Sequence, residues 1–362
     1  RGTPLSAARL IFEGKKEDVS VSGISYYDHG KRYDFLSRRP AFFKEIDYVR
    51  LADDDKGAVQ LRQIDKPDDA SFSVLSNVVF LRLRSPYTAA GKTYPAGALL
   101  ALDFDKFLAG SRAFTMVFEP SPRTSYGYIS ATKNYFLLNT LENAASHVYL
   151  LKGEKEKFAG REITGKQYKY SQVSAWGVDS DENDDYFMTV ESFLTPTTLY
   201  LCNAEQEATE KLKSQPQFFP SDNLEVRQFE ARSKDGTMVP YFLVAEKNLE
   251  LNGQNPTLLY GYGGFEVAMT PGYRALTGSA WLAKGGVYVL ANIRGGGEFG
   301  PTWHEAARKE NRQKAYDDFI AVAEDLIKRK ITTREHLGIE GGSNGGLLMG
   351  VMFTQRPDLF GA

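Results

Sequence analysis

Cysteine is almost absent from this sequence, which has one, Cys202, among 362 residues. A single thiol cannot form a disulfide within the chain or a zinc site built on cysteines. Its neighbours, residues 199–201, are Leu-Tyr-Leu and have the composition of a strand. The pattern therefore predicts a buried, structural thiol. It leaves open whether the protein is cytoplasmic or periplasmic.

Long apolar runs and an excess of charge of either sign are also missing. No run approaches the roughly 18 apolar residues that a membrane helix needs. The first residues include neither an initiator Met nor an apolar signal core. The 44 basic and 46 acidic side chains give a formal net charge of −2. This balance favours neither nucleic acid nor an anionic membrane surface as a partner.

The first part of the chain, residues 1–220, is rich in short predicted strands. Runs of β-branched and aromatic residues are separated by Gly, Asp, Asn and Ser, as at 77–81, 98–102, 135–138 and 186–188. No long stretch with the 3.6-residue period of a helix interrupts them. The pattern predicts an all-β domain with many turns.

Part of this β pattern repeats. Tyr135-Phe136 leads to the run 148–150, and 51 positions later Tyr186-Phe187 leads to a similar run at 199–201. A third, weaker copy covers 79–100. A period near 50 residues with several strands in each unit is typical of a β-propeller blade. We therefore predict a partial propeller of about four blades, incomplete at its N-terminal side, rather than a β-sandwich with accidental spacing.

Residues 221–362 alternate between predicted strands and helices. An Asp-Gly pair in 233–237 predicts a hairpin turn. Residues 286–293 form a continuous apolar run, which is typical of a buried parallel strand. Apolar positions in 315–330 have a helical period, and 337–340 and 347–355 are expected to be the last strand and the last helix. The alternation predicts an α/β domain with a doubly wound, mostly parallel sheet.

A glycine-rich turn follows the last predicted strand and contains the pattern G-x-S-x-G around Ser343. Between a strand and a helix, this pattern is typical of a hydrolase nucleophile. The tight turn lifts the hydroxyl clear of the sheet, and Gly341 and Gly345 leave room for it. The N-terminus of the following helix favours negative charge, so the N–H of Asn344 is expected to point at an oxyanion. The alternative is a helix entry in which Ser343 is only an N-cap.

A second glycine motif, G-x-G-x-x-G, stands at Gly295, Gly297 and Gly300. In a dinucleotide site, an acidic residue would end the next strand about 20 residues later. Here Asp317 and Asp318 open a predicted helix instead. The pattern therefore favours a crowded backbone loop near the carboxyl ends of the strands over a nucleotide site.

Five segments together resemble the prolyl oligopeptidase family: 258–265 (LLYGYGGF), 291–300 (ANIRGGGEFG), 303–304 (WH), 341–346 (GGSNGG) and 355–361 (QRPDLFG). The resemblance is specific over residues 225–362 and looser over the β-rich part. It implies a seven-bladed propeller joined to an α/β-hydrolase domain, here a partial propeller (1–220) and a partial catalytic domain (221–362).

The resemblance also implies a role for each matching residue. Ser343 matches the nucleophile, and Asn344 matches the residue whose N–H helps to form the oxyanion hole. Tyr262 matches the tyrosine that supplies the second oxyanion donor, and Phe265 an aromatic of the proline pocket. The implied reaction is hydrolysis of short peptides on the carboxyl side of proline through an acyl-enzyme. It needs no metal and no cofactor, and we expect a monomer.

The acid and the base of this family follow the nucleophile in the order Asp, His. Only 19 residues follow Ser343, and none is a histidine. His304 and His336 belong to predicted helices, and Asp358 is expected to be a turn residue. The missing acid and base are therefore expected beyond Ala362, and the chain alone is expected to be inactive.

Two alternatives stay open. One is another hydrolase of the same fold, such as a basic-residue oligopeptidase, an acylaminoacyl or dipeptidyl peptidase, or an esterase, because most of the specificity pocket lies downstream. The other is a propeller that serves as a binding scaffold with a non-catalytic hydrolase domain. An intact Ser343 turn and Tyr262 favour the enzyme.

Overall fold

The computed structural model describes residues 2–51, 59–154 and 157–362. The chain forms two compact units. The first comprises residues 1–119 with 154–158 and 180–182, and the second comprises 120–153, 159–179 and 183–362. Neither compact unit begins or ends near residue 220. The domain boundary expected there therefore stays a prediction.

The first unit contains two four-stranded antiparallel sheets and a small hairpin. The aromatic side chains of Tyr33, Phe104 and Phe107 are buried between them. The weaker third repeat of the sequence corresponds to the second sheet, with the hairpin inserted between two of its strands. The elements are β1 (Ser20–Asp28), β2 (Lys31–Ala41), β3 (Lys44–Leu51), β4 (Arg62–Gln63), β5 (Ser71–Leu75), β6 (Val78–Arg82), β7 (Tyr87–Ala89), β8 (Lys92–Tyr94), β9 (Leu99–Asp103), α1 (Phe104–Leu108) and β10 (Thr115–Phe118).

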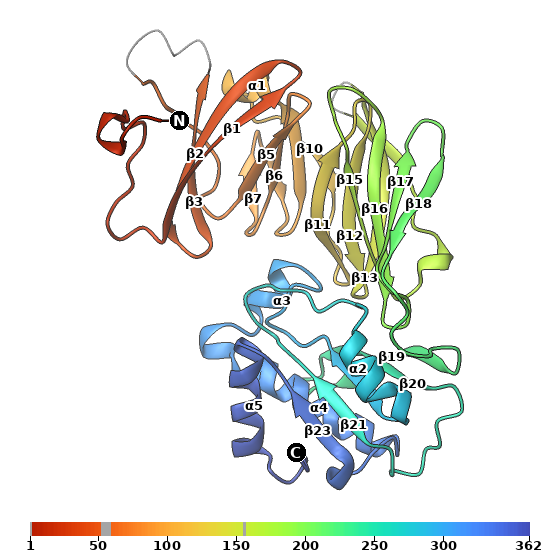
Figure 1. The fold of residues 1–362 in the computed structure, drawn as a ribbon. Coiled ribbons are helices and arrows are strands. Elements are labelled where there is room, and N and C mark those ends of the chain that lie inside the picture. The colour runs from red at the N-terminus through yellow and green to blue at the C-terminus, as the bar shows by residue number, and fades with distance from the viewer. Residues whose placement is uncertain (1, 52–58, 155–156) are drawn as a thin grey trace. The chain divides into compact units, whose positions relative to one another are not determined.

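The second unit begins with two more four-stranded antiparallel sheets, drawn from yellow to green in Figure 1. Buried and part-exposed positions alternate along β16, as expected where one face of a strand packs in a core. Within the described ranges, four sheets of four strands agree with the predicted number of about four blades. Their strands are β11 (Thr124–Ala131), β12 (Phe136–Glu142), β13 (Ala145–Glu154), β14 (Lys157–Glu162), β15 (Ser171–Gly177), β16 (Asp185–Ser192), β17 (Thr198–Asn203) and β18 (Thr209–Ser214).

Cys202 lies on β17, where it is 2% exposed. Burial raises the pKa of its thiol, because the charged thiolate is poorly solvated there. The prediction that this thiol is buried is confirmed.

The rest of the second unit is built on a five-stranded sheet in the order β19-β20-β22-β21-β23. The three strands β22, β21 and β23 are parallel, whereas β19, β20 and β22 pair antiparallel. The α/β fold was predicted correctly, but the sheet is mixed rather than mostly parallel. A tight turn at 233–237 folds β20 back along β19, which forces that pair to be antiparallel. The strands are β19 (Leu224–Arg232), β20 (Met238–Glu246), β21 (Thr257–Tyr260), β22 (Val287–Ala291) and β23 (Leu337–Glu340).

Helices flank this sheet, as the blue part of Figure 1 shows. Helix α4 packs on β19, β20 and α5, and it buries Phe319, Val322 and Leu326 completely. Helix α5 was expected to begin at Leu347 but begins directly after Ser343, because the glycines at its start can still adopt helical geometry. The helices are α2 (Ala275–Ala280), α3 (Pro301–Glu305), α4 (Gln313–Lys328) and α5 (Asn344–Gln355), with 3-10 turns η1 (Leu5–Ala7), η3 (Lys166–Tyr168), η4 (Leu282–Lys284), η5 (Lys309–Asn311) and η6 (Arg334–His336).

None of the helices in the described part of the chain combines the length and the hydropathy that crossing a membrane requires.

The packing of α4 gives a first prediction. Leu326→Ala in the whole protein should lower the free energy of unfolding by about 2–5 kcal/mol, because it leaves a cavity in the core of the sheet. Urea unfolding followed by tryptophan fluorescence measures this change. Leu276→Ala is the matched control, since Leu276 is 81% exposed. Equal unfolding midpoints for the two variants would contradict the burial of Leu326 between α4 and the sheet.

Candidate functional site

Three loops meet at one edge of the five-stranded sheet. Residues 261–270 follow β21, residues 292–300 follow β22, and the turn 341–343 follows β23. In register, Tyr260 pairs with Leu290 on one side and with Glu340 on the other. The carboxyl ends of these parallel strands therefore lie together, which is where α/β proteins usually bind their ligands.

The turn that carries Ser343 is a sharp bend between β23 and α5. Ser343 has φ 54° and ψ −116°, a backbone conformation that residues other than glycine rarely adopt. Its side chain is exposed and makes no capping hydrogen bond to α5. The hydroxyl group is therefore not used to cap the helix, and the N-cap alternative loses its support.

Glycines on both sides of Ser343 allow the backbones to approach closely. A Cβ at Gly341 would lie 2.6 Å from the carbonyl oxygen of Gly345 and 3.0 Å from that of Gly261. A Cβ at Gly345 would lie 2.7 Å from the same oxygen of Gly261. These distances are too short for a side chain, so the bend requires glycine at both positions.

Asn344 connects the Ser343 turn to the loop that carries Tyr262. The Asn344 side-chain amide donates a hydrogen bond of 2.7 Å to the backbone oxygen of Tyr262. Arg312 donates to the Asn344 Oδ1 at 3.3 Å and also to the backbone oxygen of Gly263. The structure thus brings three of the predicted site residues, Ser343, Asn344 and Tyr262, onto adjoining loops.

Phe265, the fourth predicted site residue, lies further along the Tyr262 loop. It is 50% exposed and has a φ of 54°, and Glu266 after it has a φ of 58°. Two successive left-handed residues are costly, so the surroundings must hold the loop in this shape.

The second glycine motif packs against the Tyr262 loop. A Cβ at Gly295 would lie 2.4 Å from the backbone oxygen of Gly263, and one at Gly297 would lie 2.2 Å from that of Glu266. The glycines are needed for this contact between two backbones. The interpretation as a crowded loop is therefore favoured over the nucleotide site.

Arg294 anchors the glycine motif to α4. Its Nε and Nη2 donate to the two carboxylate oxygens of Asp318 at 2.9 and 2.6 Å, and its Nη1 donates to Asp235 at 2.6 Å. Burial lowers the pKa of the guanidinium, but hydrogen bonds to both aspartates outweigh it and raise that pKa. The bond from Arg294 in turn holds the pKa of the Asp235 carboxyl far below its usual value.

The histidines of the chain are engaged elsewhere. His147 is hydrogen-bonded to Glu162 at 2.7 Å, and His336 to Gln254 at 3.2 Å. His304 is buried in α3 with its Nδ1 3.6 Å from Glu305. Asp358 lies in a turn and pairs with Arg356, as expected.

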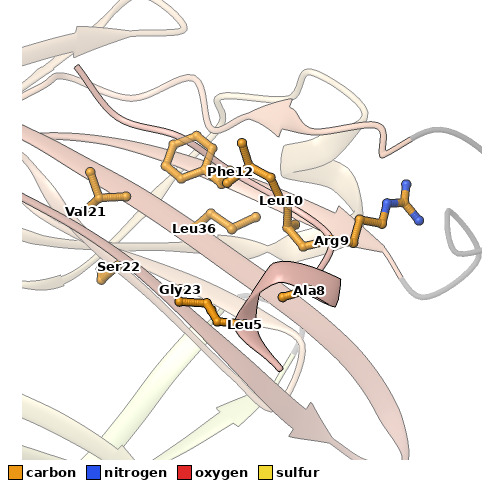
Figure 2. A pocket seen from close by; sticks show the side chains of 10 residues that line it. Leu5, Ala8, Arg9, Leu10, Phe12, Val21, Ser22, Gly23 and Leu36 are labelled. Carbon is orange, nitrogen blue, oxygen red and sulfur yellow. The ribbon is translucent and has the colours of Figure 1, made fainter. Parts of the chain in front are cut away.

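The first unit contains two further features. Figure 2 shows a hollow lined mainly by aliphatic side chains, among them Leu10 and Leu36. Among the described residues, Asp28, His29 and Asp181 form a group whose ligand atoms lie within 4.8 Å of one another and could hold a metal ion. The Asp28 carboxylate already accepts hydrogen bonds from His29 and from the backbone of Asn77, so it has a structural role.

Sequence reasoning missed two residues of these loops, Asn292 and Glu298, and one residue that bonds to them, Arg312. Arg312 gave no signal, since it is one of many basic residues. Asn292 could have been found as a polar residue at the end of a buried strand. Glu298 could have been found as a charged residue inside a glycine motif; it is 1% exposed, and burial raises its pKa to about 7.

Comparison with protein families gives two matches. A model of the prolyl oligopeptidase N-terminal β-propeller domain matches residues 2–215. A model of the prolyl oligopeptidase family matches residues 274–362.

Individual relatives agree with these matches. The chain is 42% identical to an uncharacterized peptidase of Sinorhizobium fredii, over all of the chain and 50% of that protein. It is 37% identical to a prolyl endopeptidase of Elizabethkingia meningoseptica, over 52% of the chain and 26% of that protein. A post-proline cleaving enzyme from Rickettsia typhi superposes with a TM-score of 0.91 at 35% identity, covering 100% of the chain and 52% of that structure. The chain spans about half the length of the full-length relatives that it matches.

The anchoring of Arg294 gives a second prediction. Asp318→Ala should lower the free energy of unfolding by about 3–5 kcal/mol, because it leaves the buried guanidinium without its main partner. Thermal unfolding of the whole protein measures this change. Asp235→Ala is the control: its carboxylate is 41% exposed, so the loss should be about 1 kcal/mol or less. A smaller loss for Asp318→Ala than for Asp235→Ala would refute the anchoring role.

Proposed function

The chain belongs to the prolyl oligopeptidase family, and from this premise we propose that the whole protein is a serine oligopeptidase with Ser343 as its nucleophile. The observation that carries the proposal is the Ser343 turn. Its hydroxyl group is exposed, unused by the following helix, and held on a strained glycine bend at the carboxyl edge of the sheet. Strain of this kind is typical of nucleophile turns.

In the proposed reaction, the Ser343 hydroxyl attacks the carbonyl carbon of the scissile peptide bond. A histidine, oriented by an acid, takes the proton and returns it to the leaving amine. We propose that both residues come from the part of the whole protein that follows this chain. Water then hydrolyses the acyl-enzyme.

Two donors are proposed for the developing oxyanion. The first is the N–H of Asn344, which belongs to the first turn of α5, where N–H groups have no partner inside the helix. The second is the hydroxyl group of Tyr262. The hydrogen bond between the Asn344 side chain and the Tyr262 backbone supports a fixed spacing of the two donors. Preorganised donors of this kind are usually the largest contribution to catalysis.

We propose short peptides as substrates, cut on the carboxyl side of proline, by a monomeric enzyme with propeller (1–220) and catalytic (221–362 and beyond) domains. The names of two relatives, a prolyl endopeptidase and a post-proline cleaving enzyme, support the proposed cleavage after proline. Phe265 is the proposed aromatic wall of the proline pocket. Its half-exposed ring on the Tyr262 loop supports that role.

A third prediction concerns the nucleophile. A fluorophosphonate probe should label the whole protein, and Ser343→Ala should abolish the labelling, because the probe reacts only with an activated serine. Ser76→Ala is the matched control, since Ser76 also has a positive φ, of 48°, in an unrelated turn. Labelling is quantified by mass spectrometry of the peptide that contains residue 343. A parent protein that takes up no probe would favour the binding scaffold over the enzyme.

A fourth prediction concerns Tyr262. Tyr262→Phe should lower kcat for a proline-containing peptide by about 10²–10³-fold, because one oxyanion donor is lost. KM should change little, since the donor acts mainly in the transition state. Tyr260→Phe, two residues earlier at the end of β21, is the control. Should both variants retain the parent kcat, Tyr262 is not an oxyanion donor.

A further inference from the structure

Asn292 and Glu298 form a buried polar pair that is bonded to the Tyr262 loop, residues 261–270. Asn292 is 0% exposed and Glu298 1%. The Glu298 Oε1 accepts a hydrogen bond of 2.9 Å from the N–H of Met269, and the Asn292 side-chain amide donates one of 2.6 Å to the backbone oxygen of Met269. The pair therefore satisfies both backbone polar groups of a single residue.

Met269 belongs to the segment that carries the left-handed residues Phe265 and Glu266. Backbone hydrogen bonds also hold this segment: the N–H of Val267 donates to the backbone oxygen of Gly264, and the N–H of Glu266 donates to that of Gly295. It contains no helix or strand in 261–270. A strained conformation persists only where the surroundings hold it. The two hydrogen bonds that join Met269 to Glu298 and Asn292 are called the Met269 clamp below. The clamp holds the segment that follows Tyr262 and Phe265.

Both loops, 261–270 and 292–300, are also bonded to the β-rich part of the second unit. Ser125, on β11, donates a hydrogen bond of 2.9 Å to the backbone oxygen of Glu298. Thr270, next to Met269, donates one of 2.9 Å to Gln172 on β15. Glu298 and the residue after Met269 are therefore each bonded to a strand of the β-rich part as well.

Two oxygens of the pair have no hydrogen-bond partner within the described part of the chain: Oε2 of Glu298 and Oδ1 of Asn292. An ionised carboxylate would leave one charged oxygen buried and unsatisfied, which is costly. A protonated carboxyl group carries no charge, so its burial costs less, and it still accepts the Met269 N–H through its other oxygen.

We propose that Asn292 and Glu298 are positioning residues which, with Glu298 protonated, hold the 265–270 segment in the conformation that presents Phe265 and Tyr262 to a bound peptide. The inference rests on the proposed function for its substrate, but the clamp itself can be tested without turnover.

The clamp should weaken as pH rises. Burial raises the pKa of Glu298 to about 7, although hydrogen bonds from Met269, from its own N–H and from Asn292 lower it. The stability that the neutral form confers is complete below the ordinary glutamate pKa, and it is lost as pH rises through about 7.

Other charged groups belong to the elements around this pair. Arg294, on the 292–300 loop, donates hydrogen bonds to Asp318 and Asp235. Arg123, before β11, lies over the ring of Phe299 and pairs with Glu230. Glu266 lies on the clamped segment, His304 lies in α3, and Arg312 donates to the backbone oxygen of Gly263. Because these groups can also titrate, the test compares the kcat/KM of each variant with that of the parent at the same pH. The pH profile of the parent alone would not separate their effects.

The experiment uses the whole protein with the variants Glu298→Gln and Glu298→Ala. The glutamine mimics the protonated carboxyl group, so it should restore the clamp at every pH. The ratio of its kcat/KM to that of the parent should be close to one at pH 6 and rise several-fold by pH 8.5. The alanine should lower kcat/KM about tenfold at pH 6, mainly through KM, because a buried hydrogen bond is lost.

The matched control is Asp325→Asn, which alters another internal carboxylate, bonded to Tyr241 at 2.7 Å and away from the three loops. It should keep the parent KM at both pH values. Hydrogen exchange of the Met269 amide, measured without substrate, should be faster in Glu298→Ala than in the parent, the glutamine variant or the control.

The inference is overturned if Glu298→Ala keeps the parent KM and the parent exchange rate at Met269, or if the glutamine-to-parent ratio does not change with pH. If the alanine variant fails to fold, the glutamine ratio decides. A parent that neither cleaves peptides nor reacts with the fluorophosphonate probe would refute the proposed function alone, since the exchange comparison would still decide whether the clamp exists.

Discussion

Close approach between backbones is the constraint on which the candidate site depends. Gly261, Gly341 and Gly345 meet at distances that admit no side chain, and Gly295 and Gly297 meet the Tyr262 loop in the same way. Backbone contact of this kind leaves little freedom, because no side chain can rearrange to absorb a shift. The three loops therefore form one packed layer above the strand ends, and a displacement in one is transmitted to the others.

Charge and hydrogen bonding hold this layer to the rest of the domain. Arg294 ties the glycine motif to α4 through Asp318, and Arg312 reaches across to Gly263 and Asn344. Guanidinium groups suit these places because their planar fork binds two acceptors at once. The strained backbone at Ser343 is maintained from several directions, which is what a conformation of high energy requires.

The repeated sheets and the bend at Ser343 could be predicted from the sequence, because each depends on residues close together in the chain. The period near 50 residues reflects repeated sheets, and the G-x-S-x-G pattern reflects a bend that only glycine permits, so both are local signals. The antiparallel pairing of β20 with β22 was missed, because a buried strand has the same apolar composition beside a parallel or an antiparallel neighbour. The early start of α5 was missed, since glycines weaken the helical pattern. The contacts of Arg312 and of the Asn292–Glu298 pair depend on residues far apart in the chain, and no local pattern encodes them.

The left-handed backbone at Ser343, the proposed nucleophile, also limits which side chains can stand at this position. Threonine offers the same hydroxyl group, but its branched Cβ is strongly disfavoured at positive φ. A cysteine would fit, because its side chain is unbranched. Steric fit thus restricts the hydroxyl-bearing residues at this bend to serine, and a threonine at position 343 would require a different turn.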